Sequence, residues 1–327
     1  MEFRTEIKLN KYPFQIDYNH KILFIGSCFA ENIGKYFKNN YFNVKINPFG
    51  VLYNPISIKN GLSRLINKDI MKEDELFFYN DLWNSFFHHS SFSNNDKQVC
   101  LANINKNIED YYYFLKEIDF LFITFGSAYV YENKTNKEIV SNCHKIPEKE
   151  FNQYLLDFNS LTNYYSNFIS KLIEFNPNLK IILTVSPIRY LKYGFEKNTI
   201  SKSILILLAN FLTNKYNFIY YFPSYEIIND DLRDYRFYNK DMIHPNEIAV
   251  DYICEKILDT FFNNKTKDLA KEIKKIYTAS KHKPYNISSK KHQEFLLNNL
   301  EKINIIMNNY PNIYLNDLKE IFLEQLI

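Results

Sequence analysis

The stretch of sequence that decides the fold is Ile22-Leu23-Phe24-Ile25-Gly26-Ser27-Cys28-Phe29-Ala30. It opens with a short apolar run, which is typical of a buried β-strand. After Gly26 the apolar residues Phe29 and Ile33 recur at a helical spacing. Glycine permits a sharp turn between the two elements because it has no Cβ. The stretch therefore predicts a strand, a tight elbow and a helix, with Ser27 at the junction.

Two roles suit a serine at this junction. Free backbone N–H groups gather at a helix N-terminus and favour negative charge, which suits a nucleophilic alkoxide and the oxyanion that it creates. Serine is also a preferred helix N-cap, and on the elbow alone the cap is the more common role. The two roles are compatible.

Further apolar runs alternate with helical patterns along the chain. We expect strands at residues 42–46, 120–124, 180–185 and 218–222. We expect helices at residues 57–66, 104–115, 148–175, from 199 onward, and 246–262. Continuous apolar strands that alternate with helices indicate an α/β fold, in which helices cover both faces of a mostly parallel sheet.

The division of the chain follows from a change of character after residue 262. Residues 1–262 carry the strand and helix pattern, with an aromatic insertion at 69–100 that we interpret as a lid or pocket wall. Residues 263–327 are rich in lysine and predict a helical C-terminal extension with segments at 267–280, 290–309 and 313–326. These helices are a candidate surface for a homodimer.

The composition and motifs of the chain limit the classes of partner and cofactor that we expect. The net charge of +3 is interspersed, so we expect no nucleic-acid partner. No secretory signal and no apolar run of about 20 residues is visible, so we expect no membrane association. Four scattered cysteines without a CxxC pair predict neither a zinc site nor disulfides and suit the cytoplasm. Glycine-rich nucleotide motifs are absent, and we expect no cofactor.

A second motif lies near the end of the predicted sheet domain, Asp241-Met242-Ile243-His244-Pro245. A serine nucleophile needs a base and an acid that orients the base, and one loop can supply both. The alternative is that Asp241 caps the following helix and His244 is a surface residue. In an open α/β sheet, loops at the carboxyl ends of the strands share one site. The order Ser27, Asp241, His244 therefore favours a triad.

The quoted blocks resemble one known family. Gly26-Ser27-Cys28-Phe29-Ala30 is similar to the motif that names the GSCFA family, and further blocks agree in order over roughly residues 5–260. These blocks are Asn47–Pro55, Asn142–Pro147, Ser186–Arg189 and Asp234–Pro245. The family is grouped with the SGNH/GDSL hydrolases, so the resemblance implies a flavodoxin-like three-layer α/β/α sandwich. It also implies Ser27 as nucleophile, His244 as base and Asp241 as the orienting acid.

The resemblance also implies an oxyanion hole. Its expected donors are the backbone N–H groups of Ser27 and Gly50 and a third group from a Gly-x-Asn motif. Gly126-Ser127-Ala128 departs from that motif because it has no asparagine, so Asn142 becomes the candidate for the third donor.

Four further residues are candidate substrate contacts: His89, Gly126, His144 and Arg189. Each has an ordinary structural alternative, such as a hydrogen bond within a loop or, for Arg189, an ion pair with a neighbouring carboxylate. Adjacent histidines point in different directions, so His88 and His89 do not predict a metal site. Cys28, one step along the helix from Ser27, points about 100° away and is more commonly an apolar filler than a nucleophile.

From these observations we expect a serine esterase that cleaves an ester, such as an O-acyl or O-acetyl group on a carbohydrate or small metabolite. An acyltransferase on the same scaffold and a non-catalytic ligand-binding module are the two alternatives. Because the asparagine of the Gly-x-Asn motif is missing, a non-catalytic binding module remains an alternative.

Overall fold

The computed structural model of the protein describes residues 4–327. The chain divides into two compact units. The first consists of Ile22–Gly34 and Lys45–Ile253 together with the start of the chain. The second consists of Leu9–Lys21, Lys35–Val44 and Cys254–Ile327. The second unit thus takes in three segments, residues 9–21, 35–44 and 254–262, that a division at residue 262 assigns to the sheet domain.

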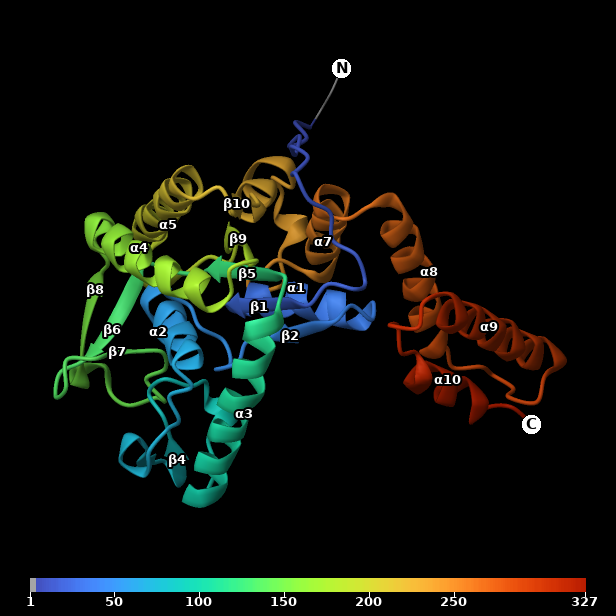
Figure 1. The fold of residues 1–327 in the computed structure, drawn as a ribbon, viewed down its shortest axis with the longest axis horizontal. Coiled ribbons are helices and arrows are strands. Elements are labelled where there is room, and N and C mark those ends of the chain that lie inside the picture. The colour runs from blue at the N-terminus through green and yellow to red at the C-terminus, as the bar shows by residue number, and fades with distance from the viewer. Residues whose placement is uncertain (1–3) are drawn as a thin grey trace. The chain divides into compact units, whose positions relative to one another are not determined.

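The first unit is built on a five-stranded sheet (Figure 1). Its order is β10-β9-β5-β1-β2, with strands Ile219–Tyr221, Lys180–Val185, Phe120–Phe125, Ile22–Gly26 and Val44–Ile46. The pairs β1–β5, β5–β9 and β9–β10 are parallel. Counted along the chain, this is the order 2-1-3-4-5 of flavodoxin-like folds. The predicted α/β sandwich with a parallel sheet is confirmed.

The register of the strands creates the core. Leu23, Leu121 and Ile181 are paired across β1, β5 and β9, and all three are fully buried. They pack in one apolar cluster with residues of α2, α3, α4 and α5. On the opposite face Phe24 stacks on Phe122, with ring centroids 4.7 Å apart. Side chains alternate between the two faces of a strand, so apolar residues at every position mean that both faces are buried.

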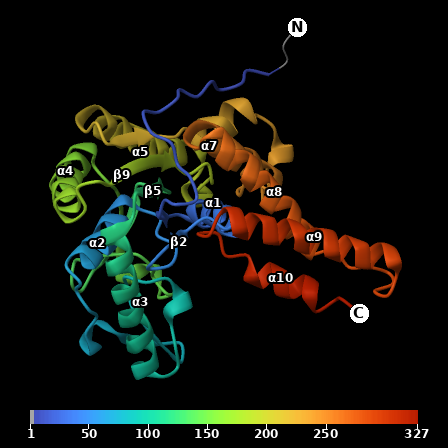
Figure 2. The same ribbon diagram turned by 45° about the vertical axis from the view of Figure 1, so that its right-hand side comes forward.

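The helices of this unit follow the strands as the sequence predicts. They are α1 (Cys28–Asn39), α2 (Pro55–Ile66), α3 (Lys97–Glu117), α4 (Phe158–Phe175), α5 (Phe195–Lys215) and α7 (Glu247–Phe261). Short helical turns occupy Glu73–Glu75, Ser90–Phe92, Glu148–Glu150, Leu191–Tyr193, Ser224–Glu226, Ile227–Asp231 and Tyr235–Phe237. In both views α4 lies beside α5, and α2 beside α3 (Figures 1 and 2).

The prediction of one helix over residues 148–175 is wrong at its start. Phe151–Leu155 forms strand β8, which pairs antiparallel with β6 (Tyr129–Asn133), and α4 begins only at Phe158. The spacing of Phe151, Leu155 and Phe158 fits a helix, but the β6 edge offers Phe151–Leu155 backbone partners that no local pattern encodes. Asp157 then accepts a hydrogen bond from Ser160 N–H at 2.8 Å and caps α4.

Two small antiparallel elements complete the unit. Strand β7 (Ile139–Val140) pairs antiparallel with β6. Within the insertion at 69–100, β3 (Phe77–Tyr79) and β4 (Leu82–Asn84) form a hairpin.

The second unit contains the predicted C-terminal helices. They are α8 (Asn264–Ser280), α9 (Lys290–Asn309) and α10 (Asn316–Leu323), with α10 beside α9 (Figure 2). Its aromatic core includes Phe37 against Phe262, with ring centroids 5.4 Å apart. Across residues 4–327, no helix combines the length and apolar character needed to cross a membrane.

Candidate functional site

The elbow after β1 has the geometry that its sequence predicts. Gly26 has φ +137°, and a Cβ there would lie 2.2 Å from the Thr124 carbonyl oxygen, so only glycine fits. Ser27 follows, and its Oγ accepts a hydrogen bond from Phe29 N–H at 3.3 Å. Ser27 therefore caps α1 in this conformation. Its side chain is buried, at 1% exposure.

The Asn47–Asn54 loop is tied to this elbow. Asn47 Oδ1 accepts a hydrogen bond from Gly26 N–H at 2.9 Å, and Leu52 N–H donates to Gly26 O at 2.8 Å. The Tyr53 carbonyl oxygen then accepts from the N–H groups of Gly126 and Ser127, at 2.8 and 2.9 Å. One loop thus holds the carboxyl ends of β1 and β5 together.

The predicted Asp241–His244 pair is formed. Asp241 Oδ2 lies 2.7 Å from His244 Nδ1, while Oδ1 accepts from the N–H groups of Ile243 and His244 at 2.9 and 3.0 Å. The backbone N–H of His244, then that of Ile243, lower the pKa of Asp241 to about 2. The carboxylate is therefore charged at neutral pH, and it favours the imidazole tautomer with a proton on Nδ1 and a free Nε2.

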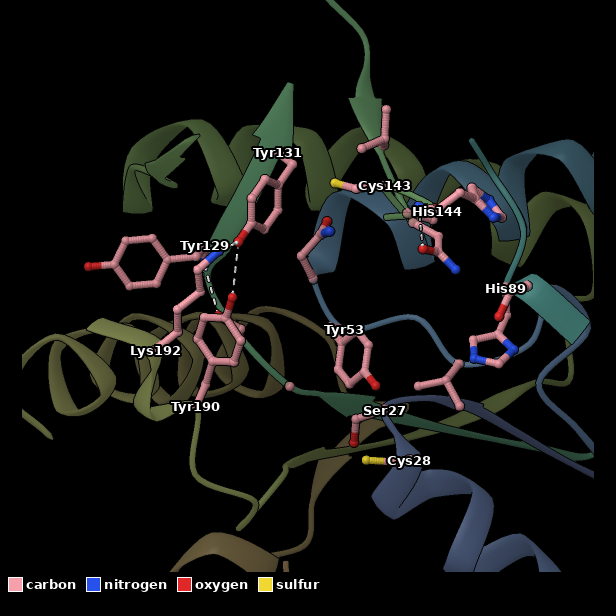
Figure 3. Close-up of a pocket in the computed structure, with 18 of the residues that line it drawn as sticks. Ser27, Cys28, Tyr53, His89, Tyr129, Tyr131, Cys143, His144, Tyr190 and Lys192 are labelled. Atoms are coloured by element: carbon pink, nitrogen blue, oxygen red, sulfur yellow. Dashed lines mark hydrogen bonds between the residues drawn. The ribbon is translucent and has the colours of Figure 1, made fainter. Parts of the chain in front are cut away.

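Ser27 and His244 line the same cavity, of about 1160 Å³. Its lining comes from loops far apart in the sequence, among them residues 79–93, 140–145 and 186–192. Figure 3 shows Tyr53 beside Ser27 and Cys28. Within the described chain no hydrogen bond joins Ser27 to His244. Hydrogen bonds of catalytic groups are often formed only when substrate is bound.

The three predicted oxyanion donors differ in availability. The Gly50 N–H donates to Asn47 O at 2.9 Å, and Gly50 is not among the residues that line the cavity. The Ser27 N–H makes a long hydrogen bond of 3.3 Å to Thr124 O. Asn142 lines the cavity, and its Oδ1 accepts from His144 N–H at 2.9 Å, which leaves its Nδ2 amide as a donor.

The four predicted substrate contacts all line the cavity. His89 lies over Gly50, where a Cβ would come within 2.2 Å of the His89 Cβ. His144 is tied to the loop, since its Nε2 lies 2.8 Å from Ser85 O, and burial lowers its pKa. Arg189 donates from its backbone to Ile243 O at 3.3 Å, next to His244.

His88, considered as a metal ligand, and Cys28, considered as an alternative nucleophile, have ordinary surroundings. His88 is 1% exposed, does not line the cavity, and burial lowers its pKa to about 3, so it is neutral. Cys28 does line the cavity, but burial raises the pKa of its thiol. A raised pKa reduces the thiolate fraction on which cysteine reactivity depends.

The sequence did not indicate the tyrosine cluster on one wall of the cavity. Tyr131 Oη lies 3.1 Å from Tyr190 Oη, and it accepts a hydrogen bond from Lys192 Nζ at 3.0 Å (Figure 3). Tyr193, which does not line the cavity, places its Oη 3.0 Å from Tyr131 Oη. Glu148 forms an ion pair with Lys192. These residues come from β6 and from the segment after β9. Tyrosine is so common in this chain that only the three-dimensional structure brings them together.

A second missed residue is Lys202 on α5. Its side chain is fully buried, and its Nζ donates to Gly126 O at 2.6 Å and to Ser186 O at 2.7 Å. Both acceptors belong to residues that line the cavity. Burial lowers the pKa of Lys202 to about 7. The sequence carries no signal for this lysine, because the buried face of α5 also holds the polar residues Asn198 and Ser201.

Among residues 4–327, no group of three or more His, Cys, Asp or Glu side chains is placed to hold a metal ion. Comparison with known proteins gives two family matches. The GSCFA family profile matches residues 21–257, and the profile of the GSCFA domain protein, C-terminal domain, matches residues 273–327. No curated protein matches the chain.

Proposed function

Because the match over residues 21–257 makes this chain a member of the GSCFA family, we propose that it is a serine esterase of the SGNH type. The observation that carries the proposal is the Asp241–His244 hydrogen bond of 2.7 Å on a loop that shares one cavity with Ser27. The substrate is an ester, such as an O-acyl group on a glycan or small metabolite.

Each residue has a defined role in the proposed reaction. Ser27 Oγ attacks the ester carbonyl carbon and gives its proton to His244 Nε2, while the charged Asp241 stabilises the imidazolium. The ester C–O bond then breaks, and the leaving alkoxide takes the proton from His244. A water molecule attacks the acyl-Ser27 carbonyl, loses a proton to His244, and the acid departs as Ser27 is reprotonated.

The oxyanion of each tetrahedral intermediate needs donors that are aimed at it. We assign this role to the Ser27 N–H and to the Nδ2 amide of Asn142. The Ser27 N–H bond to Thr124 O is long at 3.3 Å, so redirecting it costs little. Gly50 can act as a third donor only if its N–H breaks its hydrogen bond to Asn47 O.

Active-site labelling tests the proposal. A fluorophosphonate should label Ser27 in the wild type and in Cys28→Ala, and should not label Ser27→Ala. Turnover of p-nitrophenyl acetate should follow the labelling. The serine mechanism is wrong if peptide mapping finds no label on Ser27 and Ser27→Ala retains turnover. A ligand-binding module would then be the better interpretation.

An acyltransferase is the second candidate, because the aromatic insertion at 69–100 lines part of the cavity and a closed wall would exclude water. Acyl transfer to an added alcohol at a rate above hydrolysis would favour it. A cytoplasmic location and a homodimer through residues 263–327 also stay predictions.

A further inference from the structure

The charges around the cavity are of one sign. No aspartate or glutamate is among the described residues that line it. The basic residues that line it are His89, His144, His244, Lys145, Arg189 and Lys192. A cavity lined by charge of one sign attracts ligands of the opposite sign and raises their local concentration.

The nearest carboxylates are engaged with other groups. Asp241 is bonded to His244 and to two backbone N–H groups. Glu148 forms an ion pair with Lys192, which therefore adds little net charge. Burial raises the pKa of the Cys28 thiol, and the carboxylate of Glu31 on α1 adds to this as a smaller effect.

The fold holds the Arg189 guanidinium in place without a carboxylate from the described part of the chain. Its guanidinium carbon lies 4.2 Å from the centroid of the Tyr238 ring and 5.2 Å from that of Tyr235. One guanidinium nitrogen donates to Met242 O at 3.4 Å. Within residues 4–327 no ion pair joins Arg189 to an aspartate or glutamate. Stacking fixes the plane of the guanidinium and leaves most of its five N–H donors unused.

Arg189 lies beside the loop that carries His244, the proposed base, where its remaining N–H donors can bind a group of the substrate. Its backbone N–H is bonded to Ile243 O, and its side chain to Met242 O, directly before His244. A guanidinium binds a carboxylate or a phosphate through two parallel hydrogen bonds. Resting on the proposed esterase function, we propose that the substrate is an anionic ester whose carboxylate or phosphate group binds Arg189.

The test compares esters that differ in charge. The probes are 4-acetoxybenzoate, 4-acetoxyphenyl phosphate and the neutral methyl 4-acetoxybenzoate. Wild type should cleave at least one anionic ester with a kcat/KM about 10- to 100-fold above the neutral one, the range that a hydrogen bond to a charged group provides. The carboxylate and phosphate probes distinguish the two kinds of anion. Raising the salt concentration should increase KM for the anionic esters only.

Substitutions then assign the preference to one residue. Arg189→Gln should reduce the ratio of anionic to neutral kcat/KM to about one, and Arg189→Lys should restore only part of it because lysine lacks the planar fork. Arg236→Gln is the matched control, since Arg236 is exposed, lies between the two tyrosines that stack on Arg189, and does not line the cavity. It should leave the ratio unchanged. A ratio near one in the wild type, or a preference that survives Arg189→Gln, would overturn the proposal.

A binding measurement separates this proposal from the esterase itself. Titration calorimetry of Ser27→Ala with uncleaved 4-acetoxybenzoate and 4-acetoxyphenyl phosphate should show saturable binding of an anion that the added Arg189→Gln removes and the added Arg236→Gln keeps. Anion binding in a chain that cleaves none of the esters would refute the esterase and retain the anion site. Equal binding of neutral and anionic esters would refute the anion site, whatever the turnover.

Discussion

Lys202 Nζ donates a hydrogen bond of 2.6 Å to the carbonyl oxygen of Gly126. Its second bond, to Ser186 O, joins the carboxyl ends of β5 and β9 from beneath the cavity. A Cβ on Gly126 would lie 3.2 Å from the Ser27 Cβ, so this carbonyl is part of the immediate support of the serine. A fully buried ammonium without a carboxylate partner is costly, and its cost depends on pH.

Replacing Lys202 with methionine should change how stability depends on pH. The folded pKa of about 7 lies below the usual lysine pKa of 10.5, so between these pH values the unfolded chain binds more protons. Wild-type stability should therefore rise, relative to Lys202→Met, by about 2 kcal/mol between pH 7 and 9, and the difference should be constant below pH 6. Urea unfolding of both proteins at four pH values measures this. Parallel curves across pH 7–9 would show that Lys202 is charged throughout.

Asp241→Asn tests the orientation of the imidazole. An asparagine Oδ1 can still accept from the N–H groups of Ile243 and His244, but its Nδ2 then faces His244 Nδ1. The imidazole must accept there and carry its proton on Nε2, so it cannot act as the base. We expect kcat for p-nitrophenyl acetate to fall by about 10⁴, as in other triads with this change.

Two measurements accompany this variant. Its thermal unfolding at pH 7 should resemble that of the wild type, because the backbone hydrogen bonds survive. Activity of the wild type should not titrate with Asp241 above pH 4, since its pKa is about 2. A variant that keeps more than a third of the wild-type kcat would remove Asp241 from the mechanism.

The sequence predicts the sheet because its evidence is local. Strands β1, β5 and β9 are largely apolar runs, and β9 begins and ends where the pattern places it, at Lys180 and Val185. Strand β8 was missed because Phe151 and Leu155 also fit a helix, and only the β6 edge decides between the two. The Asp241–His244 pair was also predictable from local sequence, because the two residues are three apart and a short turn brings them together.

The parts of the site that the sequence does not predict depend on tertiary contacts. In the sequence, Lys202 is one lysine among many. Only the folded structure shows that its Nζ donates hydrogen bonds to the carbonyl oxygens of Gly126 and Ser186. In the sequence, Gly50 is an ordinary turn residue. In the structure its N–H donates to Asn47 O, and its α-carbon packs against the His89 side chain. Neither bond follows from composition, periodicity or spacing.

Gly50→Ala and Gly194→Ala form a matched pair. Both glycines have positive φ, +72° and +88°, so alanine is strained at either, by about 1–2 kcal/mol. At Gly194 the added Cβ meets nothing within 4 Å, but at Gly50 it comes within 2.2 Å of the His89 Cβ. Gly50→Ala should therefore be less stable by about 1–3 kcal/mol more than Gly194→Ala. Equal losses in urea unfolding would mean that the His89 segment moves away freely.

Asn142 decides whether the oxyanion has a side-chain donor. Asn142→Asp is nearly isosteric and keeps the Oδ1 that accepts from His144 N–H at 2.9 Å, but it removes the Nδ2 donor. Asn142→Ala removes both. If the amide binds the oxyanion, both variants should lose about 10²- to 10³-fold in kcat, the usual effect of one lost donor. If Asn142 only shapes its loop, Asn142→Asp should retain wild-type kcat and Asn142→Ala alone should be impaired. Steady-state kinetics with p-nitrophenyl acetate separate the two, because a structural acceptor and a catalytic donor are different atoms of the same side chain.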